Sequence, residues 1–179
     1  ARDQGKGVLV LVPEISLTPQ VVARIRQSIR ESVVVMHSGL NPAQRLAAWR
    51  AVHQGDAHIV VGPRSAIFAP IRNPGLVIVD EEHEEAYKQQ DPSPRYHGRD
   101  MATIRGWMNH APVVLASATP SLESVYLLRE RQLVERLELT KRFGATWPRV
   151  VVHDRRREAE DAPYIGPRLA EAITSHTNR

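Results

Sequence analysis

Four consecutive polar residues, Asp80, Glu81, Glu82 and His83, directly follow the apolar run Leu76–Val79. Three adjacent carboxylates repel one another unless water, a cation or separate partners relieve them. Asp80, at the tip of a predicted buried strand, is well placed to hold a magnesium ion through its waters, because hard cations prefer oxygen ligands. Glu81 could then orient or deprotonate an attacking water, and His83 could sense a bound phosphate. The run therefore predicts a magnesium-dependent hydrolytic site.

Two other interpretations of this acidic run stay open. It could be an exposed turn at the start of a helix, where carboxylates favour the positive end of the helix dipole. It could also form a metal-dependent hydrolase or nuclease site that uses all four polar residues. This last interpretation is disfavoured because adjacent residues at a strand end point in different directions and cannot all ligate one ion.

Dense polar segments also follow three other apolar runs. PEISLTPQ follows Val8–Val12, GPRSAIF follows Ile59–Val61, and SATPSLE follows Val113–Ala116. In open α/β sheets, ligands bind at the carboxyl ends of the strands, where loops and helix N-termini converge. We therefore expect these segments and the acidic run to lie at one edge of a sheet.

The elements that would position these segments alternate along the chain. Short apolar, β-branched runs predict five buried strands: Val8–Val12, Val33–Met36, Ile59–Val61, Leu76–Val79 and Val113–Ala116. Helical patterns, several opened by a Pro in the first turn, predict helices over 18–31, 41–55, 99–110 and 119–131. Trp49 and Trp107 lie in these patterns and are expected in the core. Unbroken apolar strands that alternate with helices indicate an α/β fold with a mainly parallel, doubly covered sheet.

The composition indicates one main domain. The chain has 179 residues, 42% of them hydrophobic, and no cysteine, so disulfides and a Cys-based zinc site are excluded. No apolar run approaches the ~20 residues that span a bilayer, so we expect a cytoplasmic protein with no membrane partner. The net charge of +4 is too small to indicate nucleic-acid binding by itself.

Taken together, the motifs resemble a known family. VDEEH is similar to the Walker B box, or motif II, of superfamily-2 nucleic-acid helicases, and SATP is similar to their motif III. Six phrases in order between Val8 and Arg142 resemble the PriA family of replication-restart helicases: VPEISLTPQ, HSGLNPAQRLAAW, VGPRSAIFAP, DEEHEEAYKQQ, RYHGRD and SATPSLES. The resemblance implies a RecA-like, three-layer helicase lobe.

The resemblance also implies roles around a nucleotide. Asp80 would coordinate magnesium, Glu81 would be the catalytic base for ATP hydrolysis, and His83 would belong to the same catalytic set. Ser117 and Thr119 would couple the nucleotide state to DNA. The implied cofactors are ATP and Mg²⁺, and zinc is not expected in this chain.

DNA contacts are the second set of roles that the resemblance implies. The expected residues are Thr18, Gln20, Arg64, Ser65, Tyr87, Lys88, Arg95, Tyr96 and Arg99. The loop after motif II would be the aromatic-rich loop of this family, with Tyr87 and Tyr96 stacking on bases. Packing of these tyrosine rings against the domain is the alternative, and for Arg64 the alternative is a local salt bridge.

A phosphate-binding loop is missing from the sequence. ATP hydrolysis needs the pattern G-x-x-x-x-G-K-[ST], and QGKGV at Gln4–Val8 does not match it. In the family this loop lies upstream of the first strand seen here, and motif VI with its arginine finger lies downstream. We therefore expect an N-terminally incomplete first helicase lobe over 1–142, then a linker and the start of the next lobe over 143–179. Whether the chain is itself an enzyme stays open, and we expect little or no ATPase activity from it alone.

The function implied by the resemblance is that of one part of an ATP-dependent DNA helicase. Such a helicase acts at stalled or branched replication forks and assembles the primosome for replication restart. Its expected partner is forked or single-stranded DNA, and candidate partners are other primosome proteins and single-strand-binding protein. The alternative is a non-catalytic DNA-binding or primosome-scaffolding module, which the missing phosphate loop favours and the intact DEEH run opposes.

Overall fold

The computed structural model describes residues 5–28, 32–141, 150, 152 and 165–177. The chain forms two compact units, Ala1–Glu135 and Arg136–Arg179. The first unit contains the sheet and four helices, and the second contains the helix α5 (Pro167–Thr177). The apolar run Val150–Val152 predicts one more short strand, and this run lies partly outside the described residues.

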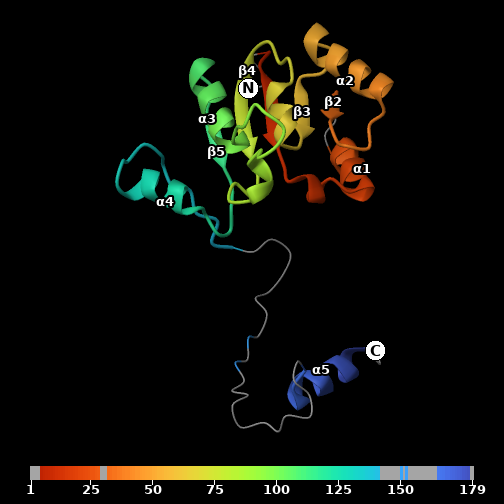
Figure 1. Cartoon of the computed structure of the whole chain (residues 1–179), viewed down its shortest axis with the longest axis vertical. Helices are drawn as coiled ribbons and strands as arrows, with labels where there is room; N and C mark the ends of the chain where they lie inside the picture. Colours follow the sequence, from red (N-terminus) through yellow and green to blue (C-terminus); the bar gives the residue numbers. More distant parts are fainter. Residues whose placement is uncertain (1–4, 29–31, 142–149, 151, 153–164, 178–179) are drawn as a thin grey trace. The chain divides into compact units, whose positions relative to one another are not determined.

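Five parallel strands form the sheet of the first unit (Figure 1). They are β1 (Gly7–Leu11), β2 (Val33–Val35), β3 (Ile59–Gly62), β4 (Pro74–Val79) and β5 (Val113–Leu115). Their order is β2-β3-β1-β4-β5, so β1 pairs with β3 on one side and with β4 on the other. The predicted α/β fold with a parallel sheet is confirmed.

Three helices connect these strands, α1 (Pro19–Ser28), α2 (Pro42–Gln54) and α3 (Gly98–Met108), and α4 (Leu122–Arg129) follows β5. Helix α2 begins with a capping box, in which the Asn41 and Gln44 side chains each accept a hydrogen bond from the other residue's backbone N–H. It ends at Gly55, whose φ of 88° is the left-handed conformation that glycine adopts readily. Among the described residues, none of the helices combines the length and apolar character needed to cross a membrane.

Helix α4 starts later than the sequence predicts. The Thr119-Pro120 pair suggests a start at 119, whereas the helix begins at Leu122 with Ser121 as its N-cap. The Ser121 hydroxyl accepts a hydrogen bond from the Ser124 backbone N–H at 3.2 Å. The Ser121 N–H also donates a hydrogen bond to the Glu82 carboxylate at 2.7 Å, which fixes the start of the helix.

Two apolar clusters cover the two faces of the sheet. Leu9 and Leu11 of β1 point to one face, where they pack in a cluster with Val52 of α2 and Ala102 of α3. The intervening Val10 packs on the opposite cluster, which includes residues of α1. Because side chains alternate along a strand, these two clusters define a helix–sheet–helix arrangement with three layers.

The two helical tryptophans do not lie in the core, contrary to the sequence expectation. Trp49 is 43% exposed and Trp107 is 79% exposed. Helix α3 instead faces the sheet with the small residues Ala102 and Gly106, both buried. A Cβ atom at Gly106 would clash with the Val113 side chain and lie 3.0 Å from the Ala111 carbonyl oxygen. Close approach of helix and sheet leaves room only for small side chains and turns Trp107 outward.

This close packing makes position 106 sensitive to size. We expect Gly106→Ala to lower the free energy of unfolding by about 1–3 kcal/mol, because overpacking forces side chains or backbone to shift. Trp107→Ala is the matched control on the neighbouring exposed position and should change it by less than about 0.5 kcal/mol. Urea unfolding of the three proteins gives both values, and an equal effect of the two substitutions would contradict this packing.

Candidate functional site

The carboxyl ends of the strands meet along one edge of the sheet. The ladder continues past the strand ends, since the Asp80 N–H donates to Leu11 O at 2.9 Å and the Glu82 N–H donates to Ala116 O at 3.0 Å. These bonds hold the acidic run between the ends of β1 and β5. The expectation that the polar segments share one edge is therefore met for these strands.

Asp80 and Glu81 form the exposed tip of this edge. The Asp80 carboxylate accepts a hydrogen bond from the Glu81 N–H at 3.1 Å, and Glu81 has a φ of 47°. This left-handed conformation is unusual for a residue other than glycine and marks a sharp turn directly after β4. The buried Tyr87 hydroxyl donates to Asp80 O at 2.6 Å and so supports the turn from beneath.

The donors at this tip fit a magnesium ion. Asp80 is exposed, and Glu81 is partly exposed beside it. Magnesium keeps several of its waters and is commonly held by one or two carboxylates. The described residues include no group of three or more His, Asp or Glu side chains placed to hold a metal ion. The pair therefore suits an ion held partly by water and by a substrate, and not a closed protein cage.

Glu82 points the other way and is only 1% exposed. Its Oε1 accepts from the Ser121 N–H at 2.7 Å. Its Oε2 accepts from the hydroxyls of Ser121 and Ser124 at 2.9 and 3.0 Å, and from Arg99 Nη1 at 3.1 Å. Burial by itself would raise the pKa of Glu82, but the hydrogen bonds from Ser121, Arg99 and Ser124 outweigh burial and lower it. A four-ligand metal site is not formed, because this carboxylate faces inward.

Arg99 is the charged partner of Glu82. Its side chain is 11% exposed, and it also donates to Asp100 and to the Ser121 hydroxyl, at 3.1 and 2.7 Å. Burial would lower the pKa of Arg99, whereas the bonds to Asp100 and Glu82 raise it. The guanidinium expected to contact DNA is thus engaged inside the protein.

His83 joins the acidic run to the segment after β5. Its Nδ1 lies 2.7 Å from Ser117 Oγ and 3.6 Å from the Glu81 carboxylate, and its Nε2 lies 3.5 Å from Thr119 Oγ1. Ser117 Oγ in turn accepts from the Thr119 N–H at 2.9 Å. The structure therefore brings together residues that the sequence placed in two separate motifs.

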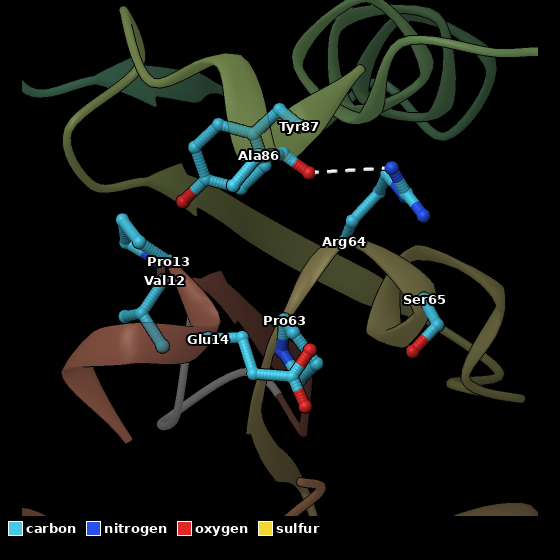
Figure 2. A pocket seen from close by; sticks show the side chains of 8 residues that line it. All are labelled: Val12, Pro13, Glu14, Pro63, Arg64, Ser65, Ala86 and Tyr87. Atoms are coloured by element: carbon cyan, nitrogen blue, oxygen red, sulfur yellow. Dashed lines mark hydrogen bonds between the residues drawn. The ribbon is translucent and has the colours of Figure 1, made fainter. Parts of the chain in front are cut away.

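A small pocket lies along the same edge, between the ends of β1 and β3 (Figure 2). It is lined by Val12, Pro13, Glu14, Pro63, Arg64, Ser65, Ala86 and Tyr87. Arg64 Nη1 donates to Ala86 O at 3.3 Å, and its guanidinium carbon lies 5.6 Å from the centre of the Tyr96 ring. Arg64 Nε is buried and has no hydrogen-bond partner within the described part of the chain. No salt bridge of Arg64 is found among the described residues, so the alternative of a local salt bridge is not supported.

The loop 88–97 is held at its base and along its length. An antiparallel bridge joins Lys88 and His97, and Gln89 Nε2 donates to the carbonyl oxygens of Pro92 and Pro94, at 2.8 and 2.9 Å. Arg95 is 77% exposed, and Lys88 is also exposed. Both cations are therefore available to a ligand at this loop.

The two tyrosines around this loop differ in position. Tyr87 lies in the core, and burial, with the charges of Asp80 and Glu81, raises its pKa. Its ring is not accessible for base stacking, so packing is the interpretation that its position supports. Tyr96 is partly exposed and meets the exposed Phe68 edge to face, with ring centres 5.1 Å apart. Sequence reasoning missed Phe68, whose only signal was its place in the segment GPRSAIF, three residues after Ser65.

Thr18 and Gln20 both lie exposed at the start of α1, and Ser65 is exposed at the start of the helical turn Arg64–Phe68. The Thr18 hydroxyl accepts from the Val21 N–H at a long 3.4 Å. These side chains are free to be approached from solvent. Their expected DNA contacts stay predictions.

An all-parallel sheet whose Asp-Glu-Glu-His end contacts a Ser-Ala-Thr segment is the arrangement of a superfamily-2 helicase lobe. The chain belongs to the DEAD/DEAH box helicase family, whose sequence model matches residues 1–128. It is 47% identical over 156 residues to "Replication restart protein PriA" of Bacillus subtilis (strain 168), covering 87% of this chain and 19% of that relative. The resemblance inferred from the six motifs is confirmed.

Relatives from other bacteria show the same similarity. The protein of that name from Haemophilus influenzae is 46% identical over 140 residues, covering 78% of this chain and 19% of the relative. That from Treponema pallidum is 45% identical over 171 residues, covering 95% of this chain and 25% of the relative. The chain spans about a fifth of the length of the curated relatives it matches.

The buried Glu82 gives a pH-dependent prediction. Glu82→Gln should lower the free energy of unfolding at pH 7 by about 3 kcal/mol, because it breaks a buried ion pair. The folded-state pKa lies below the ordinary value of 4.5, so the carboxylate stabilises the fold above that pH and loses this contribution as the pH falls through the folded-state pKa. The difference in the free energy of unfolding between the wild type and Glu82→Gln should therefore shrink as the pH falls from 5 to the acid limit of folding.

Urea unfolding at a series of pH values measures this difference. Asp91→Asn, at a carboxylate that is 89% exposed and 4.0 Å from Arg95, is the control and should cost less than about 0.5 kcal/mol. A Glu82→Gln effect of the same size at every pH would show that folding does not lower the pKa of Glu82.

Proposed function

We propose that this chain works as one lobe of a longer ATP-dependent DNA helicase that acts in the cytoplasm at stalled or branched replication forks during replication restart. The observation that carries the proposal is the contact of His83 with Ser117 and Thr119, at 2.7 and 3.5 Å. This contact links the acidic run after β4 to the segment after β5. A motor protein needs such a link if the state of the bound nucleotide is to change the binding of a second ligand. The cellular process, replication restart, is proposed because the relatives are replication restart proteins by name.

In this proposal, Asp80 and Glu81 at the exposed tip of the sheet edge carry out ATP hydrolysis. Asp80 holds magnesium, and Glu81 orients and deprotonates the water that attacks the terminal phosphate. Magnesium, when bound, neutralises charge on the phosphates. His83, within reach of both Glu81 and Ser117, reports the state of that site to the segment Ser117–Thr119.

DNA binds, in the same proposal, along the neighbouring stretch of the edge. The exposed donors there are Thr18, Gln20, Ser65, Lys88 and Arg95, with Arg64 and Tyr96 beside them. Arg and Lys at strand ends and loops are typical phosphate contacts, and an accessible aromatic ring can stack on a base. Single-stranded or forked DNA is the proposed partner, followed by other primosome proteins and single-strand-binding protein.

The chain alone is proposed to hydrolyse little or no ATP. Its sequence contains no G-x-x-x-x-G-K-[ST] pattern, and Asp80 and Glu81 do not provide a phosphate cradle or a transition-state cation. This absence favours the second candidate, a DNA-binding or primosome-scaffolding module without catalysis. The second candidate predicts salt-dependent binding to forked DNA that nucleotide does not change.

The test is ATP hydrolysis by the longer polypeptide in the presence of single-stranded DNA. Glu81→Gln should lower kcat by about 10²–10⁴-fold, the usual contribution of a general base, while ATP still binds. Glu85→Gln is the control, since Glu85 is exposed four residues further along the same acidic segment. Hydrolysis by Glu81→Gln at the wild-type rate, or none by the wild type, would favour the scaffolding module.

A further inference from the structure

Phe68 is an exposed aromatic side chain in a segment that is otherwise mostly buried. It is 56% exposed, whereas Ala66, Ile67 and Ala69 are each at most 3% exposed. It ends the helical turn Arg64–Phe68, which follows the carboxyl end of β3. One exposed apolar residue is common on a protein surface and needs no function of its own. The contacts around Phe68 therefore decide whether this ring has a use.

Arg105 of α3 fixes the backbone on both sides of Phe68. Its Nη1 donates to Ile67 O, and its Nη2 donates to Ala69 O at 2.8 Å. The Ile67 and Ala69 side chains are buried, so the chain cannot turn at this point without losing apolar contacts and both hydrogen bonds. A ring that is already fixed loses little conformational freedom when a ligand covers it. Phe68 is therefore exposed on a rigid support.

The Tyr96 ring lies against Phe68 and is itself largely engaged. The two rings meet edge to face, with ring centres 5.1 Å apart and an angle of 74° between their planes. Tyr96 is partly buried and packs against the apolar cluster on one face of the sheet. The Arg64 guanidinium carbon lies 5.6 Å from the centre of the Tyr96 ring. Of the two rings, Phe68 is therefore the one with the larger exposed fraction.

Two cationic side chains lie next to Tyr96, one in space and one along the chain. Arg64 donates from Nη1 to Ala86 O at 3.3 Å, and its Nε has no hydrogen-bond partner in the described part of the chain (Figure 2). Arg95, the residue before Tyr96, has a side chain that is 77% exposed. Positive charges beside an exposed, flat apolar ring suit a polyanion that also carries flat apolar groups. Single-stranded nucleic acid has this chemistry.

Duplex DNA and a protein partner fit this surface less well. In a duplex each base is paired and stacked on its neighbours, so no base face is free to meet Phe68. An apolar side chain of a protein could cover Phe68, but it would not use the positive charges of Arg64 and Arg95. An unpaired base uses both features, because its face can stack on the ring while the phosphates on either side accept hydrogen bonds from the arginines.

We propose that Phe68 is the residue on which an unpaired base of single-stranded DNA stacks, with Tyr96 holding the Phe68 ring and Arg64 in place. The inference rests on the proposed function, and it moves base stacking from Tyr96 to a residue that the sequence does not single out. The Phe68 side chain has no hydrogen-bonding group, so the site accepts any of the four bases. It therefore contributes affinity for unpaired DNA without reading the DNA sequence.

The test is equilibrium binding of the longer polypeptide to a fluorescently labelled single-stranded oligonucleotide and to a blunt duplex of the same sequence. Phe68→Ala should raise the Kd for single-stranded DNA by about 5- to 150-fold, the loss expected for one stacked base. The Kd for the duplex should change by less than about twofold, because its bases are not free to stack. Phe68→Leu keeps an apolar side chain without a flat ring and should lose nearly as much affinity, whereas Phe68→Trp should retain the wild-type affinity.

Trp49→Ala is the matched control, since Trp49 is another exposed aromatic residue, 43% exposed, on α2. It should leave both Kd values unchanged, and a loss equal to that of Phe68→Ala would count against the inference. The inference is wrong if Phe68→Ala binds single-stranded DNA as tightly as the wild type, if it weakens binding of the two DNAs equally, or if Phe68→Leu restores the affinity. A wild type that binds no single-stranded DNA would overturn the proposed function itself.

Photocrosslinking of the wild type keeps the test decisive if Phe68→Ala unfolds, which circular dichroism would reveal. An oligonucleotide that carries iododeoxyuridine crosslinks on irradiation to an aromatic ring stacked on the modified base, and mass spectrometry of the peptides locates the crosslinked residue. The expected product joins the modified base to Phe68. With the modified base placed at each position in turn, a crosslink to Tyr96 and none to Phe68, or no crosslink to either, would overturn the inference.

Discussion

The parallel pairing of β1 with both β3 and β4 brings the polar segments of this protein together at one edge of the sheet. Leu11, the last residue of β1, is in register with Gly62 of β3 and Val79 of β4. Because all three strands run the same way, their carboxyl ends must open on one edge. The short polar segments that follow them are neighbours for this reason alone, although Leu11 and Val79 lie 68 residues apart along the chain.

Neighbouring segments form a working site only if their side chains are held in place. Here the side chains of the acidic run divide between two environments. Asp80 and Glu81 stay at the surface, whereas Glu82 enters a buried, fully bonded position and His83 reaches across to Ser117. The buried carboxylate provides rigidity, and in the proposed function the exposed carboxylates provide the chemistry. This division also answers how three adjacent carboxylates coexist, since Glu82 is relieved by Arg99 and by the helix start at Ser121.

Much of this arrangement could be predicted from the sequence. Apolar β-branched runs fixed the five strands to within a residue or two, since a doubly covered parallel strand needs an unbroken apolar run. Asn41-Pro42 and Gly55 indicate the two ends of α2, because helix caps are formed by local residue types that can be read directly from a sequence. The candidate roles of Asp80 and Glu81 followed from their place at a strand end.

The inward-facing residues could not be predicted in the same way. Whether Glu82 or Arg99 faces solvent depends on Ser121, which lies 39 residues from Glu82 and has no sequence pattern that links it to either. Tyr87 was weighed as a stacking residue because exposed and buried tyrosines look alike in a sequence. The helical pattern around Trp107 predicts a core position, because such a pattern does not reveal that α3 approaches the sheet through Gly106.

We propose that the nucleotide is hydrolysed at the Asp80–Glu81 tip of the sheet edge. The most direct measurement is a crystal structure of the longer polypeptide with magnesium and a non-hydrolysable ATP analogue. We expect a magnesium ion at the Asp80 carboxylate, with at least one of its waters between them and its water oxygens at about 2.0–2.1 Å, and the terminal phosphate beside Glu81. A nucleotide bound at another edge of the sheet, with Asp80 and Glu81 facing only solvent, would contradict it.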